Sequence, residues 1–147
     1  MYDYESLYGI HLEFTSRCNL LCPQCARVKD GAVNPDLPLE NMSLDTVQKI
    51  FDEMGNKIQY VHLCGNYGDF VAYPHALEAI DIITQSGVDF IKIYTNGSAR
   101  TKEFWIELAD KLSNDRGQIV FSIDGLDDTN HLYRKNAKWD SIMTAIK

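Results

Sequence analysis

Four segments with the pattern of β-strands alternate with four that have the pattern of amphipathic helices, and this order limits the fold of the 147-residue chain more than any other feature. The strand patterns lie at residues 8–14, 58–64, 88–94 and 118–123. Apolar residues at helical spacing follow each of them, at residues 43–54, 74–86, 101–112 and 139–146. Because parallel strands need such crossovers, the sequence predicts an α/β fold with a parallel sheet and right-handed connections.

Local signals indicate where several of these helices begin. Ser43 and Thr101 are suitable N-cap residues, and Pro74 stands at a position where a helix tolerates proline. The stretch 29–42 combines glycine, proline, asparagine and acidic residues, which is typical of a connection. No linker or low-complexity stretch divides the chain, so residues 1–147 are predicted to form a single domain.

The composition argues against several classes of function. Lys and Arg number 14 against 21 Asp and Glu, a formal charge of −7, and no basic run offers a surface for nucleic acid. The N-terminus lacks the positive start and apolar run of a secretory signal. No segment approaches the ~18 apolar residues of a membrane span. We therefore expect a cytoplasmic protein with no nucleic-acid or membrane partner.

Polar, glycine-rich or metal-ligating residues follow every expected strand. In parallel α/β sheets the carboxyl ends of the strands meet at one edge, where ligands bind. The sequence therefore predicts one site, built from the cysteines at 18, 22 and 25, the segments 65–69 and 95–98, and residues 122–125.

Three of the four cysteines form a C-x3-C-x2-C loop, with Cys18, Cys22 and Cys25 as its members. Such tight spacing favours a metal centre in a reducing compartment over disulfides. Thiolates suit both iron–sulfur clusters and zinc. A structural zinc site needs a fourth ligand, which Cys64 or a histidine would supply, although Cys64 is better interpreted as a buried strand residue. A cubane cluster held by three cysteines instead leaves one iron open to a chelating small molecule.

Placed directly after a first strand, this loop resembles the motif of the radical S-adenosylmethionine (SAM) superfamily. The resemblance implies that Cys18, Cys22 and Cys25 hold a [4Fe–4S] cluster whose open iron binds the amino and carboxylate groups of SAM. An electron, supplied by a flavodoxin- or ferredoxin-like donor, would cleave SAM to methionine and a 5′-deoxyadenosyl radical, which takes hydrogen from a small-molecule or peptide substrate. The sequence departs from the family at Gln24, where an aromatic residue usually precedes the last cysteine.

The resemblance also implies cofactor-binding residues at the other strand ends. Gly68 and Asp69 stand where the family has a Gly-Gly-Glu-like motif for the SAM amino group, although Gly-Asp is also common in turns. Ser122 would contact SAM and Arg134 would pair with its carboxylate; the alternative for Arg134 is a solvated surface charge. Asn96 would face SAM or the substrate, or would simply form an Asn-Gly turn.

The family core is usually a partial (β/α)6 barrel, and about four of its βα units are expected here. Residues 122–125 and 133–134 are similar to the molybdopterin-biosynthesis and peptide-modifying members of the family. We therefore expect an incomplete, C-terminally truncated core whose fourth strand is an open edge that a complementing chain would cover. Three functions stay open: a radical SAM enzyme, a non-catalytic cluster-binding fragment that needs a partner, and a zinc-binding α/β module.

Overall fold

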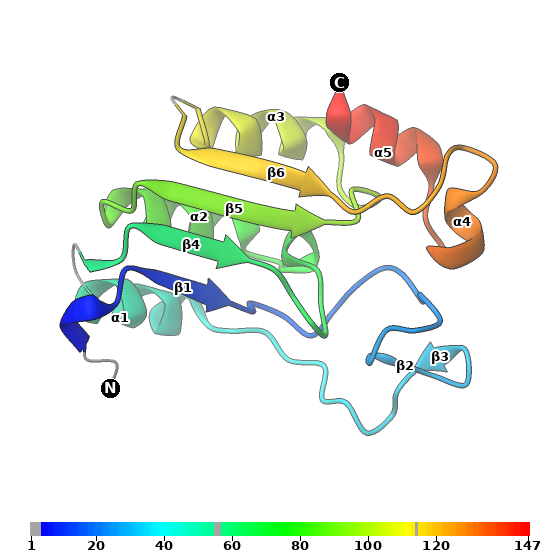
Figure 1. The fold of residues 1–147 in the computed structure, drawn as a ribbon, viewed down its shortest axis with the longest axis horizontal. Coiled ribbons are helices and arrows are strands. Elements are labelled where there is room, and N and C mark those ends of the chain that lie inside the picture. Colours follow the sequence, from blue (N-terminus) through cyan, green and yellow to red (C-terminus); the bar gives the residue numbers. More distant parts are fainter. Residues whose placement is uncertain (1–3, 55–56, 114) are drawn as a thin grey trace.

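The computed structural model describes residues 4–54, 57–113 and 115–147. In this part of the chain the centre is a sheet of four parallel strands, in the spatial order β1 (Gly9–Leu12), β4 (Tyr60–Leu63), β5 (Phe90–Thr95) and β6 (Gly117–Phe121) (Figure 1). Because this order follows the chain, each βα unit adds its strand at the same growing edge. The predicted α/β fold with four parallel strands is confirmed, and β6 is an outer strand of the sheet.

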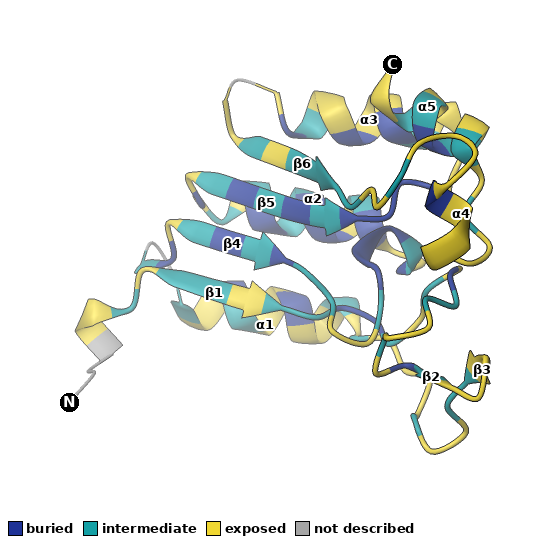
Figure 2. Cartoon of the chain, turned by 45° about the vertical axis from the view of Figure 1, so that its right-hand side comes forward, coloured by how far each residue is buried: buried dark blue, intermediate teal, exposed yellow. Residues whose placement is uncertain are grey.

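The helices α1 (Leu44–Met54), α2 (Ala76–Gln85) and α3 (Lys102–Lys111) lie along one face of the sheet, and the opposite face carries no helix (Figures 1 and 2). The last helix, α5 (Trp139–Ile146), contacts α3. None of the helices in the described ranges is long and apolar enough to cross a membrane.

The alternation of side chains along the strands places the hydrophobic core on the helical side. Val61 and Leu63 of β4 and Ile91 and Ile93 of β5 are fully buried against the helices. Their neighbours in each strand point to the other face and are only half-buried. Since burying one such aliphatic side chain contributes ~1.5–3 kcal/mol, this two-residue period fixes which face of the sheet packs and which stays open.

The structure confirms the predicted helix starts to different degrees. The Ser43 hydroxyl accepts a hydrogen bond from the backbone N–H of Thr46, at 3.1 Å, and so caps α1 as predicted. Thr101 occupies the N-cap position of α3, but its side chain makes no capping bond to the helix. Pro74 comes before α2, whose N-cap is His75.

Several short elements were not predicted. Within the stretch expected to be a plain connection, β2 (Val28–Lys29) and β3 (Ala32–Val33) form an antiparallel hairpin. Asp30 and Gly31 turn between these strands, both with positive φ (53° and 79°), which is the Asp-Gly hairpin turn. The 3-10 turns η1 (Tyr4–Ser6) and η3 (Phe70–Ala72) and the short helix α4 (Asn130–Tyr133) were also missed, because elements of three or four residues are too short to show a periodic pattern.

Candidate metal and cofactor site

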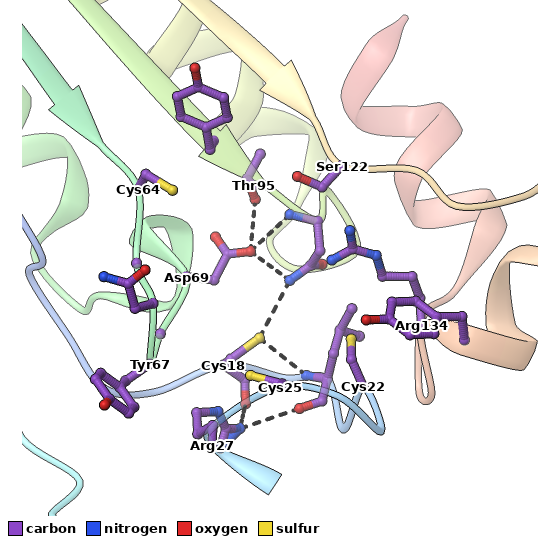
Figure 3. A pocket seen from close by; sticks show the side chains of 17 residues that line it. Cys18, Cys22, Cys25, Arg27, Cys64, Tyr67, Asp69, Thr95, Ser122 and Arg134 are labelled. Carbon is purple, nitrogen blue, oxygen red and sulfur yellow. Dashed lines mark hydrogen bonds between the residues drawn. The ribbon is translucent and has the colours of Figure 1, made fainter.

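The carboxyl ends of the strands meet around a cavity of about 190 Å³ (Figure 3). Every residue proposed from the sequence as a metal or cofactor ligand lines it: Cys18, Cys22, Cys25, Gly68, Asp69, Asn96, Ser122 and Arg134. The parallel topology explains this convergence, because segments far apart in the chain are brought to one edge of the sheet. The structure thus brings the predicted site residues together; which of them hold a cofactor stays a prediction.

The cysteine loop runs between β1 and the hairpin as a series of turns. The backbone N–H of Cys25 donates to the carbonyl of Cys22 at 3.0 Å, and the N–H of Val28 donates to the carbonyl of Cys25 at 2.8 Å. The N–H of Leu21 bonds the carbonyl of Lys135 at 3.0 Å, which fastens the loop to the segment after α4. The loop therefore has a defined shape that spreads three thiols along one wall of the cavity.

All four cysteines are free thiols and are half-buried. Burial raises the pKa of the Cys18 thiol and of the Cys22 thiol, and Arg134 opposes this effect at Cys22. Thiols with a raised pKa are protonated at neutral pH, and they become thiolates when a metal displaces the protons. Cys64 was expected inside a strand, but it lies just after β4 and also lines the cavity.

The chemistry of the donor set suits an iron–sulfur cluster, because three thiols line one cavity and thiolates are the ligands that hold such clusters. Within the described residues, no three His, Cys, Asp or Glu side chains converge closely enough to share one metal ion. In a cubane cluster each cysteine binds a different iron, so Cys18, Cys22 and Cys25 would hold the cluster from the cavity wall that they line.

Asp69 is the centre of a buried hydrogen-bond network. One carboxylate oxygen accepts from the backbone N–H of Val71 at 3.1 Å and so caps η3. The other accepts from the Thr95 hydroxyl at 3.1 Å and from the backbone and side-chain N–H groups of Asn96, at 2.8 and 2.6 Å. Burial raises the pKa of Asp69, while these hydrogen bonds act in the opposite direction. Asp69 therefore joins the loops after β4 and β5, in addition to facing the cavity.

Asn96 extends this network to the cysteine loop. Its side-chain Nδ2 donates to Oδ1 of Asn19 at 3.0 Å and lies 3.6 Å from the Cys18 sulfur. Its side-chain Oδ1 accepts from the backbone N–H of Ser98 at 2.8 Å, and Gly97 has a φ of 71°. Asn96 thus forms the Asn-Gly turn and also lines the cavity, and its contact with SAM or the substrate stays a prediction.

Ser122 and Arg134 complete the far side of the cavity. The backbone N–H of Ser122 donates to the carbonyl of Thr95 at 2.8 Å, which aligns the ends of β5 and β6. The Arg134 side chain is 22% exposed, and its Nε donates to Asp124. Arg134 is therefore half-buried and ion-paired at the cavity, and its contact with the SAM carboxylate stays a prediction. Its ion-pair partner is Asp124, in the segment that follows β6.

Sequence reasoning missed one charged residue of the site. Arg27 is 3% exposed and lines the cavity beneath the cysteine loop. Its Nη2 donates to the carbonyl oxygens of Cys18, at 2.5 Å, and Leu20, at 3.3 Å. The available signal was its position two residues after Cys25, but spacing alone does not indicate that an arginine turns inward.

Comparison with known proteins agrees with this geometry. The structure "Native anSMEcpe with bound AdoMet" is 16% identical, with a TM-score of 0.69 over 95% of this chain and 40% of that one. The "Crystal structure of BtrN in complex with AdoMet and 2-DOIA" is 14% identical, with a TM-score of 0.63 over 94% of this chain and 55% of that one. The chain therefore spans about half or less of the length of these two structures.

At these identities the likeness shows the fold: the (β/α) arrangement of radical SAM enzymes. No curated protein matches the chain by sequence. The sequence model of the radical SAM superfamily, however, matches residues 12–147, a range that begins at the last residue of β1 and includes the cysteine loop and the strands β4, β5 and β6. The chain belongs to the radical SAM superfamily.

Proposed function

We propose that this chain is the catalytic core of a radical SAM enzyme, which cleaves SAM reductively and uses the product to take hydrogen from a small molecule or a peptide. The observation that carries the proposal is the convergence of three free thiols and the polar strand ends on one cavity. When bound, a [4Fe–4S] cluster supplies the electron that breaks the sulfonium C–S bond. A flavodoxin- or ferredoxin-like protein is the proposed source of that electron.

Each group at the cavity has a proposed task. Cys18, Cys22 and Cys25 hold the cluster as thiolates. Asp69, which has accepting capacity left on the oxygen that caps η3, receives the ammonium group of SAM. Arg134 donates its remaining N–H groups to the SAM carboxylate, because a guanidinium offers several donors in one plane.

The substrate is proposed to lie along the helix-free face of the sheet, next to the cavity. His11, His62, Lys92 and Gln118 face one another across the four strands there, because they are register partners. Tyr94, the next residue after Lys92 on the same face of β5, lines the cavity itself. This face therefore gives a substrate hydrogen-bonding side chains within reach of the SAM site, whereas the buried opposite face gives it none.

The direct test is the formation of 5′-deoxyadenosine by the purified, iron-loaded chain with SAM and dithionite. We expect slow cleavage that is not coupled to substrate, because a 5′-deoxyadenosyl radical needs a closed, dry site and the sheet is open at β6. A chain or segment that supplies further βα units should raise the yield and give a single particle size in light scattering. Rapid, substrate-coupled turnover by the 147-residue chain as a monomer would contradict the need for such a complement.

The alternative is a cluster-binding fragment that acts only with a partner, and the outer position of β6 in the sheet favours it. The same assay separates the two. Cluster loading and SAM binding without any 5′-deoxyadenosine identify the fragment, and product formation identifies the enzyme.

Exchanging Asp69 for asparagine should weaken SAM binding while leaving the cluster in place. The substitution keeps the size of the side chain but removes the charge that an ammonium group would meet. Losing one charge-assisted hydrogen bond costs roughly 1.5–3 kcal/mol, or ~10–150-fold in affinity. Titration of SAM into the iron-loaded wild type and D69N measures the difference. Equal affinities would leave Asp69 with only its role of joining the loops after β4 and β5.

A further inference from the structure

Arg27 is a buried cation whose charge has no ionic partner in the part of the chain that the structure describes. Arg27 is only 3% exposed. No carboxylate lies within ion-pair distance of its guanidinium there, unlike Arg134, which pairs with Asp124. The hydrogen bonds of its side chain go to two backbone carbonyls. Burying a charge costs free energy unless an opposite charge or several hydrogen bonds offset it, so two carbonyl dipoles offset this one only in part.

The geometry indicates where the missing negative charge would come from. Arg27 donates to the backbone carbonyl of Cys18 at 2.5 Å. It lines the same cavity as the thiols of Cys22 and Cys25. A cluster held by the thiolates of Cys18, Cys22 and Cys25 would place negative charge beside the guanidinium, because Arg27 lines the same cavity and bonds the Cys18 backbone.

The contacts of Arg27 also shape the cysteine loop. Its Nη2 bonds the carbonyls of Cys18 and Leu20 together, two residues apart at the start of the loop. Its own backbone carbonyl accepts from the N–H of Asn34 at 2.8 Å, which fastens it to the segment after the hairpin. The residue therefore bridges both ends of the loop that carries the three thiols.

We propose that Arg27 is a positioning residue for the cluster: its guanidinium holds the cysteine loop in the shape that accepts the iron, and its charge raises the cluster's reduction potential. This inference rests on the proposed function, because it concerns the cluster that Cys18, Cys22 and Cys25 would bind. A nearby positive charge stabilises the reduced cluster more than the oxidised one, since the reduced form carries one more electron. Second-shell contacts of this kind typically alter metal affinity by ~10–100-fold when removed.

The test compares Arg27→Gln and Arg27→Lys with the wild type, each as the full chain loaded with iron and sulfide. The first readout is the midpoint potential, from a dithionite titration followed by electron paramagnetic resonance. The second is the rate of iron release to a chelator. R27Q should shift the potential to more negative values and release iron at least ~10-fold faster. R27K keeps the charge and so the potential, but it releases iron faster, because an ammonium lacks the planar fork that reaches both carbonyls.

Arg100, although exposed, provides a control for an arginine that only braces the backbone. It also donates to two backbone carbonyls, those of Val71 and Tyr73, each at 2.6 Å, but it does not line the cavity. Arg100→Gln should lower the melting temperature without changing the potential or the release of iron.

Each outcome of this experiment decides one part of the proposal. A wild-type potential in loaded R27Q overturns the charge effect, and wild-type iron release in both Arg27 variants overturns the positioning effect. If R27Q folds by circular dichroism but takes up no iron, positioning is supported, and R27K decides the charge effect: a potential clearly more negative than that of the wild type overturns it. A wild type that binds no iron at all refutes the proposed function instead.

Discussion

Changing any one of Cys18, Cys22 and Cys25 to alanine is expected to abolish cluster binding, whereas Cys64→Ala leaves it unchanged. Three thiolates are the fewest that hold a cubane cluster with one open iron, and two leave a second iron without a protein ligand. The loop that carries them has a shape held by its own turns and by Arg27, so we expect the two remaining thiols to keep their places. We expect iron content to fall from near four per chain, the number in such a cluster, to near zero.

Cys64 is a demanding control for this prediction. It is also free, half-buried and part of the same cavity wall, but it follows β4 and does not belong to the cysteine loop. After anaerobic reconstitution, iron and sulfide are assayed together with the broad absorption near ~400 nm of a thiolate-ligated cluster. Stoichiometric zinc without iron in the wild type, or an equal loss in C64A, would show that the site is a zinc centre with Cys64 among its ligands.

The order of elements and the place of the site were predictable because both depend on local patterns. The two-residue period of β4 and β5 and the helical period of α1 can be recognised from residues close together in the sequence. The alternation of such strands and helices predicts a parallel sheet. Once the sheet is parallel, the residues after its strands must meet at one edge. That rule alone brings Cys18, Asp69 and Asn96 to one cavity, although up to 78 residues separate them.

The energetic roles of individual side chains were not predictable, because they depend on distant partners. Asp69 was proposed only as a cofactor ligand or a turn residue, and nothing near it in sequence indicates that Thr95 and Asn96 bond its carboxylate. Arg27 gave no signal for burial, since an arginine is exposed in most contexts. The hairpin turn at Asp30 and Gly31, in contrast, had a recognisable Asp-Gly signal that was passed over within a stretch of polar residues.

Gly68→Ala is expected to be the most destabilising single-methyl change at this site. The reason is a backbone clash, and it differs from the role in SAM binding that the family motif suggests for this glycine. The resemblance indicates a glycine that lets the backbone approach SAM. In the structure, a Cβ at residue 68 would lie 1.9 Å from the carbonyl oxygen of Thr15 and 2.7 Å from its carbonyl carbon. These are backbone atoms at the start of the cysteine loop, so they cannot turn aside as a flexible side chain would.

The clash lies where the loop after β4 packs against the start of the cysteine loop. The backbone N–H of Asp69, the next residue, donates to the carbonyl of Arg17 at 2.9 Å, and a methyl group at residue 68 must break this contact or push the loops apart. Overpacking of this kind costs ~1–3 kcal/mol and more when backbone must move, so we expect at least ~3 kcal/mol and a melting temperature lower by ~10 °C.

The matched control for Gly68→Ala is Gly31→Ala in the hairpin turn. A Cβ at residue 31 meets nothing within 4 Å, but the φ of 79° disfavours alanine. That change should therefore cost only ~1–2 kcal/mol of backbone strain. Thermal unfolding of the iron-free chains compares the two losses without any contribution from the cofactor. If G68A unfolds at the wild-type temperature, the loops are not in the contact described here; if it is destabilised only as much as G31A, backbone strain and not the Thr15 carbonyl limits this position. A loss clearly larger in G68A establishes that the glycine is needed to dock the loop after β4 against the cysteine loop, before any cofactor binds.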